Sequence, residues 1–267
     1  YWKRMEFSPE QWKSIAEHCK DKNLVFLSSA FSKEAVSLLD KLKMPAWKIA
    51  SGEVSNTELL SEMAETNKPI LISSGMSSIS EIQQAIEIVK GKSPFGVLQS
   101  TSAYPCPPEK LGLNLINAFR DIFDCPVGLS DHTGVIFSGL AAATLGIDIL
   151  EVHVTLSKEM FGPDISSSIT TKELSELVEG INYIEKTINN PVDKDKMAVE
   201  LKPLRNLFTK SVVSISEIPT NTIIERNMLT AKKPGTGIPE KNIDQVVGKK
   251  AKHNIGKDKV VKLTDIE

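Results

Sequence analysis

The sequence predicts an α/β protein, a (β/α)8 barrel that lacks its first two β/α units, followed by a small β-rich domain. Three observations support this prediction. Short apolar segments alternate with helix-period segments from Ser8 to about Asn189, polar residues follow each apolar segment, and the composition changes near residue 190. Such alternation is typical of parallel sheets, in which helices connect successive strands.

Each element follows from a local pattern. Ser8, Pro9 and Glu10 form a favourable helix start, with an N-cap hydroxyl, a proline at the first helical position and an early carboxylate. The predicted helices span 9–20, 33–42, 56–66, 80–90, 114–122, 134–145 and 172 to about 187. The predicted strands span 24–29, 46–50, 69–73 and 95–99, and two more begin at 126 and 147 and run into His132 and His153. The pattern therefore gives six β/α units.

Polar residues gather at the carboxyl end of every predicted strand. They are Ser29, Ser51-Gly52-Glu53, Ser73-Ser74-Gly75, Ser100-Thr101, Ser130-Asp131-His132 and Glu151 with His153. An open doubly wound sheet, the alternative, would concentrate its site at one switch point. Functional loops after all strands favour a barrel. A complete barrel needs two more units, and because the chain begins with Tyr1 rather than Met, we expect those units to precede it.

The chain changes character after residues 1–190. Residues 191–205 are charged and lose strand character, which predicts a linker. Residues 206–267 contain short β-branched runs separated by turn residues, for example at 212–215 and 243–248, which predicts a second, small domain. From Ser211 onward the net charge is +3, against −5 for the first 210 residues.

Composition excludes several classes of protein. With 40% hydrophobic and 25% charged residues, the chain is an ordinary globular protein. Its net charge of −2 gives no indication of nucleic-acid binding, and no apolar run approaches the length of a membrane span. The three cysteines are widely spaced and no signal peptide is visible, which predicts a cytoplasmic location.

Two histidines are the most informative residues. His132 and His153 each lie where a predicted strand runs into a loop, and the helix-period segment between them completes a βαβ unit. Both imidazoles therefore project from the carboxyl ends of neighbouring parallel strands, where such folds build their sites. One such histidine alone is more often an ordinary polar residue, but two on adjacent strand ends favour a shared metal or substrate. Two imidazoles suit Mn, Fe, Co or Zn, and they leave open positions for water or substrate.

A second group of residues predicts an anion site. Lys48, Ser51 and Ser73 follow successive strands, and with Ser29 and Ser130 they can surround a phosphate with one ammonium group and several hydroxyls. Taken singly, a Ser-Gly pair after a strand is more often a plain turn. The glycine-rich nucleotide motifs are absent from the sequence, so a nucleotide phosphate is not favoured. The loop that carries Tyr104 is stiffened by prolines, and it either presents the phenol hydroxyl or serves as a connector.

The ordered series KIASGE, ISSGMS, TSAYPCPPE, GLSDHT, EVHVT and FGPD closely resembles the N-acetylneuraminate (sialic acid) synthase family. The resemblance runs from about residue 10 to the end, and residues 206–267 resemble that family's SAF, or antifreeze-like, domain, a small β-clip fold. It implies a TIM barrel that condenses phosphoenolpyruvate with an N-acetylated sugar such as N-acetylmannosamine. The chain is then a carbon–carbon bond-forming transferase.

The resemblance also implies a role for each matched position. His132 and His153 are the implied ligands of a divalent metal, usually Mn²⁺, with Mg²⁺ and Co²⁺ as alternatives. The implied phosphoenolpyruvate ligands are Lys48, Ser51, Ser73 and Ser130, with Ser29 where the family usually has Thr. The implied substrate-facing residues are Glu53, Tyr104, Glu151 and Asp164. Glu53 or Glu151 would handle protons, and the sequence does not distinguish them.

Two departures from the family pattern bear on function. The family's opening strand, with an E-A-G-x-N-H-like motif, and a following unit with a phosphate-binding Lys have no match in this chain. In the SAF domain, Lys233 stands where the bacterial family has an Arg that reaches the partner subunit's sugar, so the charge is kept but the bidentate fork is lost. We therefore expect residues 1–267 alone to be poorly soluble and to show no detectable condensation.

Three further expectations concern the assembly of the protein and its alternative functions. The polar linker and the positive charge of the last domain predict a domain-swapped homodimer in which 206–267 covers the partner's barrel mouth. Legionaminic or pseudaminic acid synthesis, the same reaction on another sugar, is the related alternative. The alternative from another class is a non-catalytic protein, either an incomplete barrel or one whose SAF domain serves only for binding.

Overall fold

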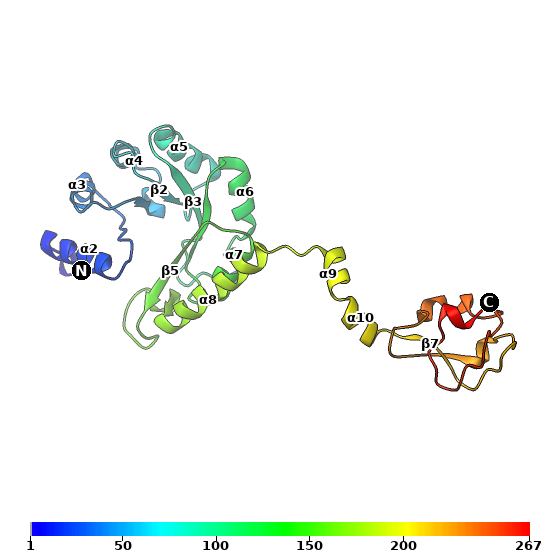
Figure 1. The fold of residues 1–267 in the computed structure, drawn as a ribbon. Coiled ribbons are helices and arrows are strands. Elements are labelled where there is room, and N and C mark those ends of the chain that lie inside the picture. The colour runs from blue at the N-terminus through cyan, green and yellow to red at the C-terminus, as the bar shows by residue number, and fades with distance from the viewer. Residues whose placement is uncertain (1) are drawn as a thin grey trace. The chain divides into compact units, whose positions relative to one another are not determined.

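The computed structural model describes residues 2–267, and side chains from Lys3 onward. The chain forms two compact units, the first ending at Asn190 and the second comprising Pro191–Glu267 (Figure 1). Each unit has a hydrophobic core of its own.

The first unit is built on a six-stranded parallel sheet whose strands follow the order of the sequence. Its strands are β1 (Trp47–Ile49), β2 (Ile70–Ser73), β3 (Phe95–Ser100), β4 (Val127–Asp131), β5 (Ile149–Thr155) and β6 (Ser168–Thr170). Sequential parallel order brings all carboxyl ends to one edge. Within residues 2–267 the sheet does not close on itself.

Helices precede or connect the strands (Figure 1). They are α1 (Trp2–Met5), α2 (Pro9–Asp21), α3 (Lys33–Lys41), α4 (Thr57–Ala64), α5 (Ile79–Val89), α6 (Asn114–Phe123), α7 (Phe137–Thr144) and α8 (Thr171–Ile188). Ser8, Ser78 and Thr170 cap α2, α5 and α8 through complete capping boxes, in which hydroxyl and third-residue side chain satisfy exposed amides. The seven helices predicted from sequence all form, with ends shifted by up to about three residues.

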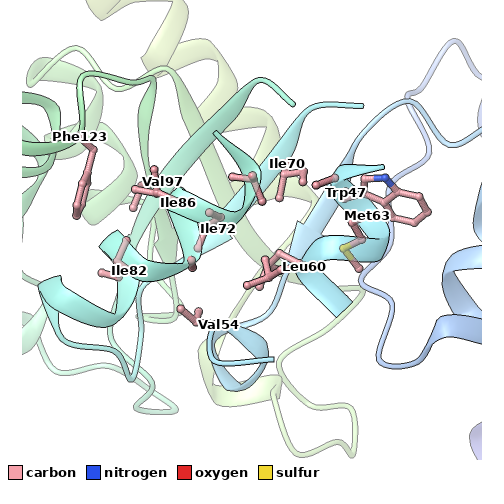
Figure 2. Close-up of a cluster of buried hydrophobic side chains, with 14 of the residues drawn as sticks. Trp47, Val54, Leu60, Met63, Ile70, Ile72, Ile82, Ile86, Val97 and Phe123 are labelled. Atoms are coloured by element: carbon pink, nitrogen blue, oxygen red, sulfur yellow. The ribbon is translucent and has the colours of Figure 1, made fainter. Parts of the chain in front are cut away.

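The core of the first unit lies between the sheet and its helices. Trp47 and Ile70 of adjacent strands are fully buried, as are Leu60 and Met63 of α4 (Figure 2). Buried side chains of this size each contribute about 1.5–3 kcal/mol through burial alone. The apolar strand residues thus anchor the sheet and leave its carboxyl ends to polar side chains.

Two strand predictions were wrong. Residues 24–29 do not form a strand, because the backbone of this segment pairs with the sheet only through an isolated bridge from Ser29 to Lys48. Leu24 and Val25 are largely exposed, so the apolar run lacks the burial that stabilises a strand. The structure adds β6, which sequence reading missed because Ser168–Thr170 is short and polar. The strand that carries His153, predicted as buried, is mostly half-buried.

The second unit contains α9 (Lys194–Glu200), α10 (Lys202–Phe208), and an antiparallel pair formed by β7 (Ser211–Ser214) and β8 (Leu229–Lys232). The predicted linker therefore includes two short helices. Isolated bridges supply most other pairing here, and the run at 243–248 begins in a 3-10 helix (Glu240–Gln245) rather than a strand. Val212 and Ile224 lie in the core of this unit.

The predicted fold class, a partial TIM barrel with a small SAF-like domain, is confirmed at the level of architecture. Six parallel strands with connecting helices form one unit, and a small unit with an antiparallel pair follows. Among the residues described, no helix is both long and apolar enough to cross a membrane.

Candidate active site

A cavity of about 310 Å³ lies at the carboxyl edge of the sheet. Most of the residues singled out from the sequence line it. Its lining comprises Ser29, Lys48, Ala50, Ser51, Ser73, Tyr104, Ser130, His132, Glu151, Val152 and His153. The cavity therefore joins the two groups, histidines and anion ligands, that the sequence suggested separately.

Two serines, Ser51 and Ser73, line one side of the cavity. Ser51 Oγ donates to Ser73 Oγ at 3.1 Å and accepts from the Gly75 amide at 3.2 Å. A Cβ at Gly75 would lie 2.5 Å from Ser51 Oγ and 2.6 Å from Ser102 Oγ, so a larger residue at this position would displace these hydroxyls. Two neighbouring hydroxyls beside the Lys48 ammonium group suit an anion.

Lys48, Glu151 and Ser130 form a connected polar group. Lys48 Nζ lies 3.6 Å from Glu151 Oε2, and Ser130 Oγ donates to Glu151 Oε1 at 2.6 Å. Burial lowers the pKa of Lys48 from its ordinary value, and the Glu151 carboxylate opposes that shift. The group places a cation from β1 beside a carboxylate from β5, two strands that are not paired with each other.

The two imidazoles lie close together. His132 directly follows β4 and His153 lies on β5, and their ring centroids are 5.2 Å apart. His132 Nδ1 lies 3.1 Å from the Thr101 carbonyl, which can only accept, so Nδ1 donates and the neutral ring keeps its Nε2 lone pair free. Burial holds the pKa of His132 below its ordinary value, against the raising effect of the Thr101 hydrogen bond.

Tyr104 and Asp164 complete the surroundings of the histidines. The Tyr104 hydroxyl lies 3.3 Å from His132 Nε2, where it can donate to the free lone pair. Asp164 Oδ2 lies 3.9 Å from His153 Nδ1. Burial raises the pKa of Tyr104, and the carboxylates of Asp164 and Glu151 add to the shift. The phenol therefore stays protonated and able to donate.

Three sequence-predicted residues lie outside the cavity lining: Asp164, which lies beside His153, Glu53 and Lys233. Glu53 follows Ser51 in a short 3-10 helix, and its carboxylate accepts from Asn56 Nδ2 at 2.8 Å. Lys233 belongs to the second unit, where its Nζ lies 5.1 Å from the centre of the Phe208 ring. Of the two candidate proton-handling carboxylates, only Glu151 lines the cavity.

Sequence reading missed several supporting residues. Asp131 is buried and accepts from the Thr133 amide at 2.9 Å and from Ser138 Oγ at 2.6 Å, which fixes the loop after His132. Ser100 Oγ is buried without a hydrogen-bond partner. Asp131 had a visible signal, its position beside His132, whereas the role of the Thr101 carbonyl has no signal in residue type.

The donor set fits a divalent metal with open positions. Among the described residues no three His, Cys, Asp or Glu side chains gather as a metal centre. Two imidazoles, one with its free Nε2 fixed by the Thr101 carbonyl, still provide neutral nitrogen ligands of the kind that Mn²⁺ or Co²⁺ accepts. Remaining positions would belong to water or substrate oxygen.

Comparison with known proteins decides the family. One family model, the NeuB family, matches residues 1–193, and a second, the SAF domain, matches residues 209–267. The chain belongs to the NeuB family. Its resemblance to the sialic acid synthases, noted from six motifs, is thereby confirmed.

Named synthases are among the NeuB-family relatives. Human N-acetylneuraminate-9-phosphate synthase is 35% identical over 97% of this chain and 72% of its own length. N,N'-diacetyllegionaminic acid synthase of Campylobacter jejuni is 33% identical over 97% of this chain and 78% of its own. The solved sialic acid synthetase of Leptospira borgpetersenii, in complex with citrate, matches with a TM-score of 0.70 and 30% identity over 74% of this chain and 71% of that one. As a NeuB-family synthase, the chain is an enzyme of the class that forms a carbon–carbon bond with phosphoenolpyruvate.

Proposed function

We propose that the natural protein condenses phosphoenolpyruvate with an N-acetylated amino sugar, N-acetylmannosamine being the first choice, to give N-acetylneuraminate and phosphate. The observation that supports this proposal is the single cavity that joins Lys48 and the serines to the histidine pair. An anion site beside a pair of metal-binding imidazoles is what the two substrates require.

The phosphate of phosphoenolpyruvate would bind beside Lys48. Its ammonium group and the hydroxyls of Ser51 and Ser73 line the cavity and can donate to phosphate oxygens. Ser130 and Ser29 line the same cavity and extend the donor set. These groups stabilise the negative charge that the phosphate carries when it leaves.

His132 and His153 would hold the divalent ion, Mn²⁺ by the family resemblance. Bound there, such an ion acts as a Lewis acid on the aldehyde oxygen of the sugar. Thr101 fixes the ring of His132 for this role through its carbonyl. Tyr104 and Asp164, both beside the imidazoles, would orient the sugar through hydrogen bonds.

The proposed reaction balances as follows. The methylene carbon of phosphoenolpyruvate forms a bond to the aldehyde carbon, and the aldehyde oxygen gains a proton to become a hydroxyl. Water adds to C2 of the former enol phosphate, and the C–O bond to phosphate breaks. We assign these proton transfers to Glu151, and its contacts with Ser130 and Lys48 at the cavity support this assignment. Glu53 is not in the cavity lining, which favours Glu151.

The decisive test measures phosphate release by the natural full-length protein. Phosphoenolpyruvate and Mn²⁺ are supplied with N-acetylmannosamine, its 6-phosphate, or the acceptors of legionaminic and pseudaminic acid synthesis. We expect turnover with N-acetylmannosamine, and its loss in His132→Ala and His153→Ala variants that still bind phosphoenolpyruvate. Turnover with only one of the other acceptors would reassign the sugar, and no release with any of them would refute the proposal.

We also propose a domain-swapped homodimer in which residues 206–267, Lys233 included, reach the partner's barrel mouth. The net charge of +3 from Ser211 onward supports this, because both substrate phosphate and carboxylate are anionic. Light scattering should give twice the monomer mass. A monomer that keeps full activity after removal of the second unit would contradict the proposal.

A cytoplasmic location is part of the same proposal. Cys19, Cys106 and Cys125 are all free thiols in the structure, as expected in a reducing compartment. Fractionation of the source cells, with the protein followed by antibody, tests this location.

A further inference from the structure

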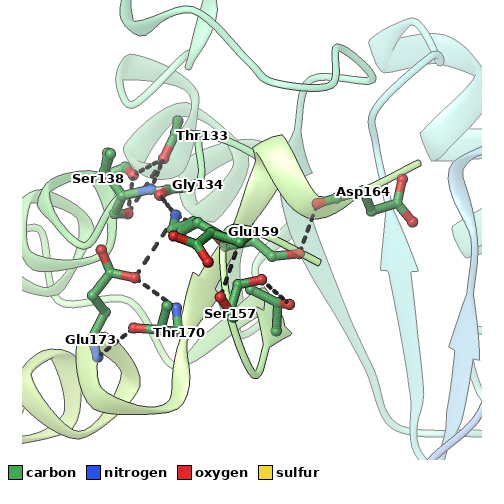
Figure 3. Close-up of polar contacts among 12 residues, drawn as sticks. Thr133, Gly134, Ser138, Ser157, Glu159, Asp164, Thr170 and Glu173 are labelled. Atoms are coloured by element: carbon green, nitrogen blue, oxygen red, sulfur yellow. Dashed lines mark hydrogen bonds and ion pairs between the residues drawn. The ribbon is translucent and has the colours of Figure 1, made fainter. Parts of the chain in front are cut away.

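Lys158 lies in the loop after β5, outside the cavity lining, yet its ammonium group joins three separate elements. Its Nζ donates to the Gly134 carbonyl at 2.8 Å and to the Ser168 carbonyl, and it lies 3.8 Å from Glu173 Oε2. Gly134 belongs to the loop after β4, Ser168 begins β6, and Glu173 lies in the first turn of α8 (Figure 3).

The two backbone contacts of Lys158 are each close, in the chain or in space, to a proposed metal ligand. Gly134 is two residues beyond His132. Ser168 is the direct partner of His153 in the β5–β6 register. One side chain thus links the backbone that follows the first imidazole to the backbone that lies beside the second.

The link continues to Asp164. Ser168 Oγ donates to the Asp164 carbonyl at 2.7 Å, and the Ser167 amide donates to the same oxygen at 3.0 Å. Asp164 in turn faces His153 across 3.9 Å. The residues from Lys158 to Asp164 are therefore held at both ends by contacts that meet at Ser168.

The loop after β4 fits closely against this assembly. Gly134 has a φ of +73°, and a Cβ there would lie 2.4 Å from the Ser166 carbonyl oxygen. Asp131 fixes the same loop from its other side through Thr133 and Ser138. Within this close packing, Lys158 is the cation placed between the Gly134 and Ser168 carbonyls, and an uncharged side chain would leave both oxygens without that donor.

We propose that Lys158 is a positioning residue, which clamps the loops after β4 and β5 together and so fixes His132, His153 and Asp164 relative to one another. This inference rests on the proposed role of the histidines in metal binding. It distinguishes the metal site from the core of the phosphate site, because Lys48, Ser51 and Ser73 belong to β1, the 3-10 helix after it and β2, whereas the contacts of Lys158 are to Gly134, Ser168 and Glu173. Loss of Lys158 should weaken metal binding and leave phosphoenolpyruvate binding unchanged.

The test compares Lys158→Met with Lys172→Met, which removes an exposed cation of α8 that pairs with Glu176. Calorimetry gives the Kd for Mn²⁺ and for phosphoenolpyruvate, and amide hydrogen exchange reports on the two loops. In Lys158→Met we expect faster amide hydrogen exchange at 133–136 and 157–168. The Kd for Mn²⁺ should rise by about 10–100-fold, as it does when other residues that orient metal ligands are replaced. The Kd for phosphoenolpyruvate should not change. Lys172→Met should match the parent protein in all three.

Two further variants sharpen the result. Glu173→Gln keeps the α8 cap but removes the ion pair with Lys158. Because an exposed ion pair of this kind contributes little stability, the Mn²⁺ affinity of this variant should stay close to that of the parent protein. Lys158→Arg retains donors for both carbonyls and should restore part of the lost affinity. The clamp would be overturned if Lys158→Met kept the hydrogen-exchange rates of the two loops and the Mn²⁺ affinity of the parent protein. It would also be overturned if the affinities for Mn²⁺ and for phosphoenolpyruvate fell by the same factor. If the parent itself shows no His132-dependent Mn²⁺ binding, the metal proposal fails, and loop exchange alone decides the clamp.

Discussion

Lys48 is a mostly buried cation whose side chain is 12% exposed and which faces Glu151 across 3.6 Å. Its position on β1 is set by strand register, since Trp47 and Ile49 on either side are buried in the core. The apolar neighbours thus hold the ammonium group in the cavity without a bound anion. Its counter-charge comes from a different strand, through Glu151.

Replacing this cation should weaken phosphoenolpyruvate binding selectively. Hydrogen bonds to charged groups contribute about 1.5–3 kcal/mol each, so Lys48→Ala should raise the Kd roughly 10- to 150-fold. Lys92→Ala, which removes an exposed cation paired with Glu65, is the matched control and should leave the Kd unchanged. Equal affinity of Lys48→Ala and the parent in a calorimetric titration would show that the phosphate binds elsewhere.

The lowered pKa of Lys48 has a consequence for alkaline pH. Burial disfavours the charged form, so the lysine of the free protein loses its proton below the ordinary value of 10.5. Phosphoenolpyruvate affinity should therefore fall as pH rises through that lowered pKa. Stability should change in the opposite sense, because the unfolded chain binds the proton more tightly, so unfolding becomes harder as pH rises through the same window. Titrations of Kd and of urea midpoint between neutral and alkaline pH test both signs.

At the residue scale, the sequence indicated most of the side chains that line the cavity. His132, His153 and Lys48 are recognisable because imidazoles and a lone cation at strand ends have few structural uses. The Thr101 carbonyl and the Lys158 clamp were not predictable in this way. Their roles depend on backbone oxygens that every residue carries, so only the folded geometry reveals them.

At the scale of elements, periodicity and capping predicted helices well because both signals are local. Strands were predicted less well because a strand forms only where its backbone pairs with another strand. Residues 24–29 have the apolar pattern of a strand but only one bridge to β1, whereas Ser168–Thr170 lacks the pattern and becomes β6 through pairing with β5. Pairing with distant segments decided both cases, and a short stretch of sequence contains no information about those distant partners.

Two glycines with nearly equal backbone angles allow a direct test of loop packing. Gly134 and Gly146 have φ values of +73° and +71°, but only Gly134 is close to other atoms, with Ser166 O 2.4 Å from a built Cβ. Gly146→Ala should cost about 1–2 kcal/mol from the left-handed conformation alone. Gly134→Ala should cost roughly a further 1–3 kcal/mol from crowding, measured by urea unfolding. Equal losses in the two variants would mean that the loops after β4 and β5 do not pack as described.

At the scale of the whole molecule, the two units have separate hydrophobic cores. We therefore expect Pro191–Glu267 to fold when produced alone. Calorimetry of the intact chain should show two transitions, one of which reappears at the same temperature in the isolated second unit. A single shared transition, with an unfolded second unit in isolation, would show that neither core is sufficient without the other.

The division into units is also a division of charge. The first 190 residues carry 17 basic and 24 acidic side chains, and residues 191–267 carry 15 basic and 10 acidic ones. Phosphoenolpyruvate thus approaches a unit whose long-range field repels it, while the other unit of the same chain attracts it. Since salt screens both fields within about 10 Å at 0.1 M, ionic strength becomes a way to separate them. Added salt should speed capture of phosphoenolpyruvate more for the first unit alone, whose net charge is −7, than for the intact chain, whose net charge is −2.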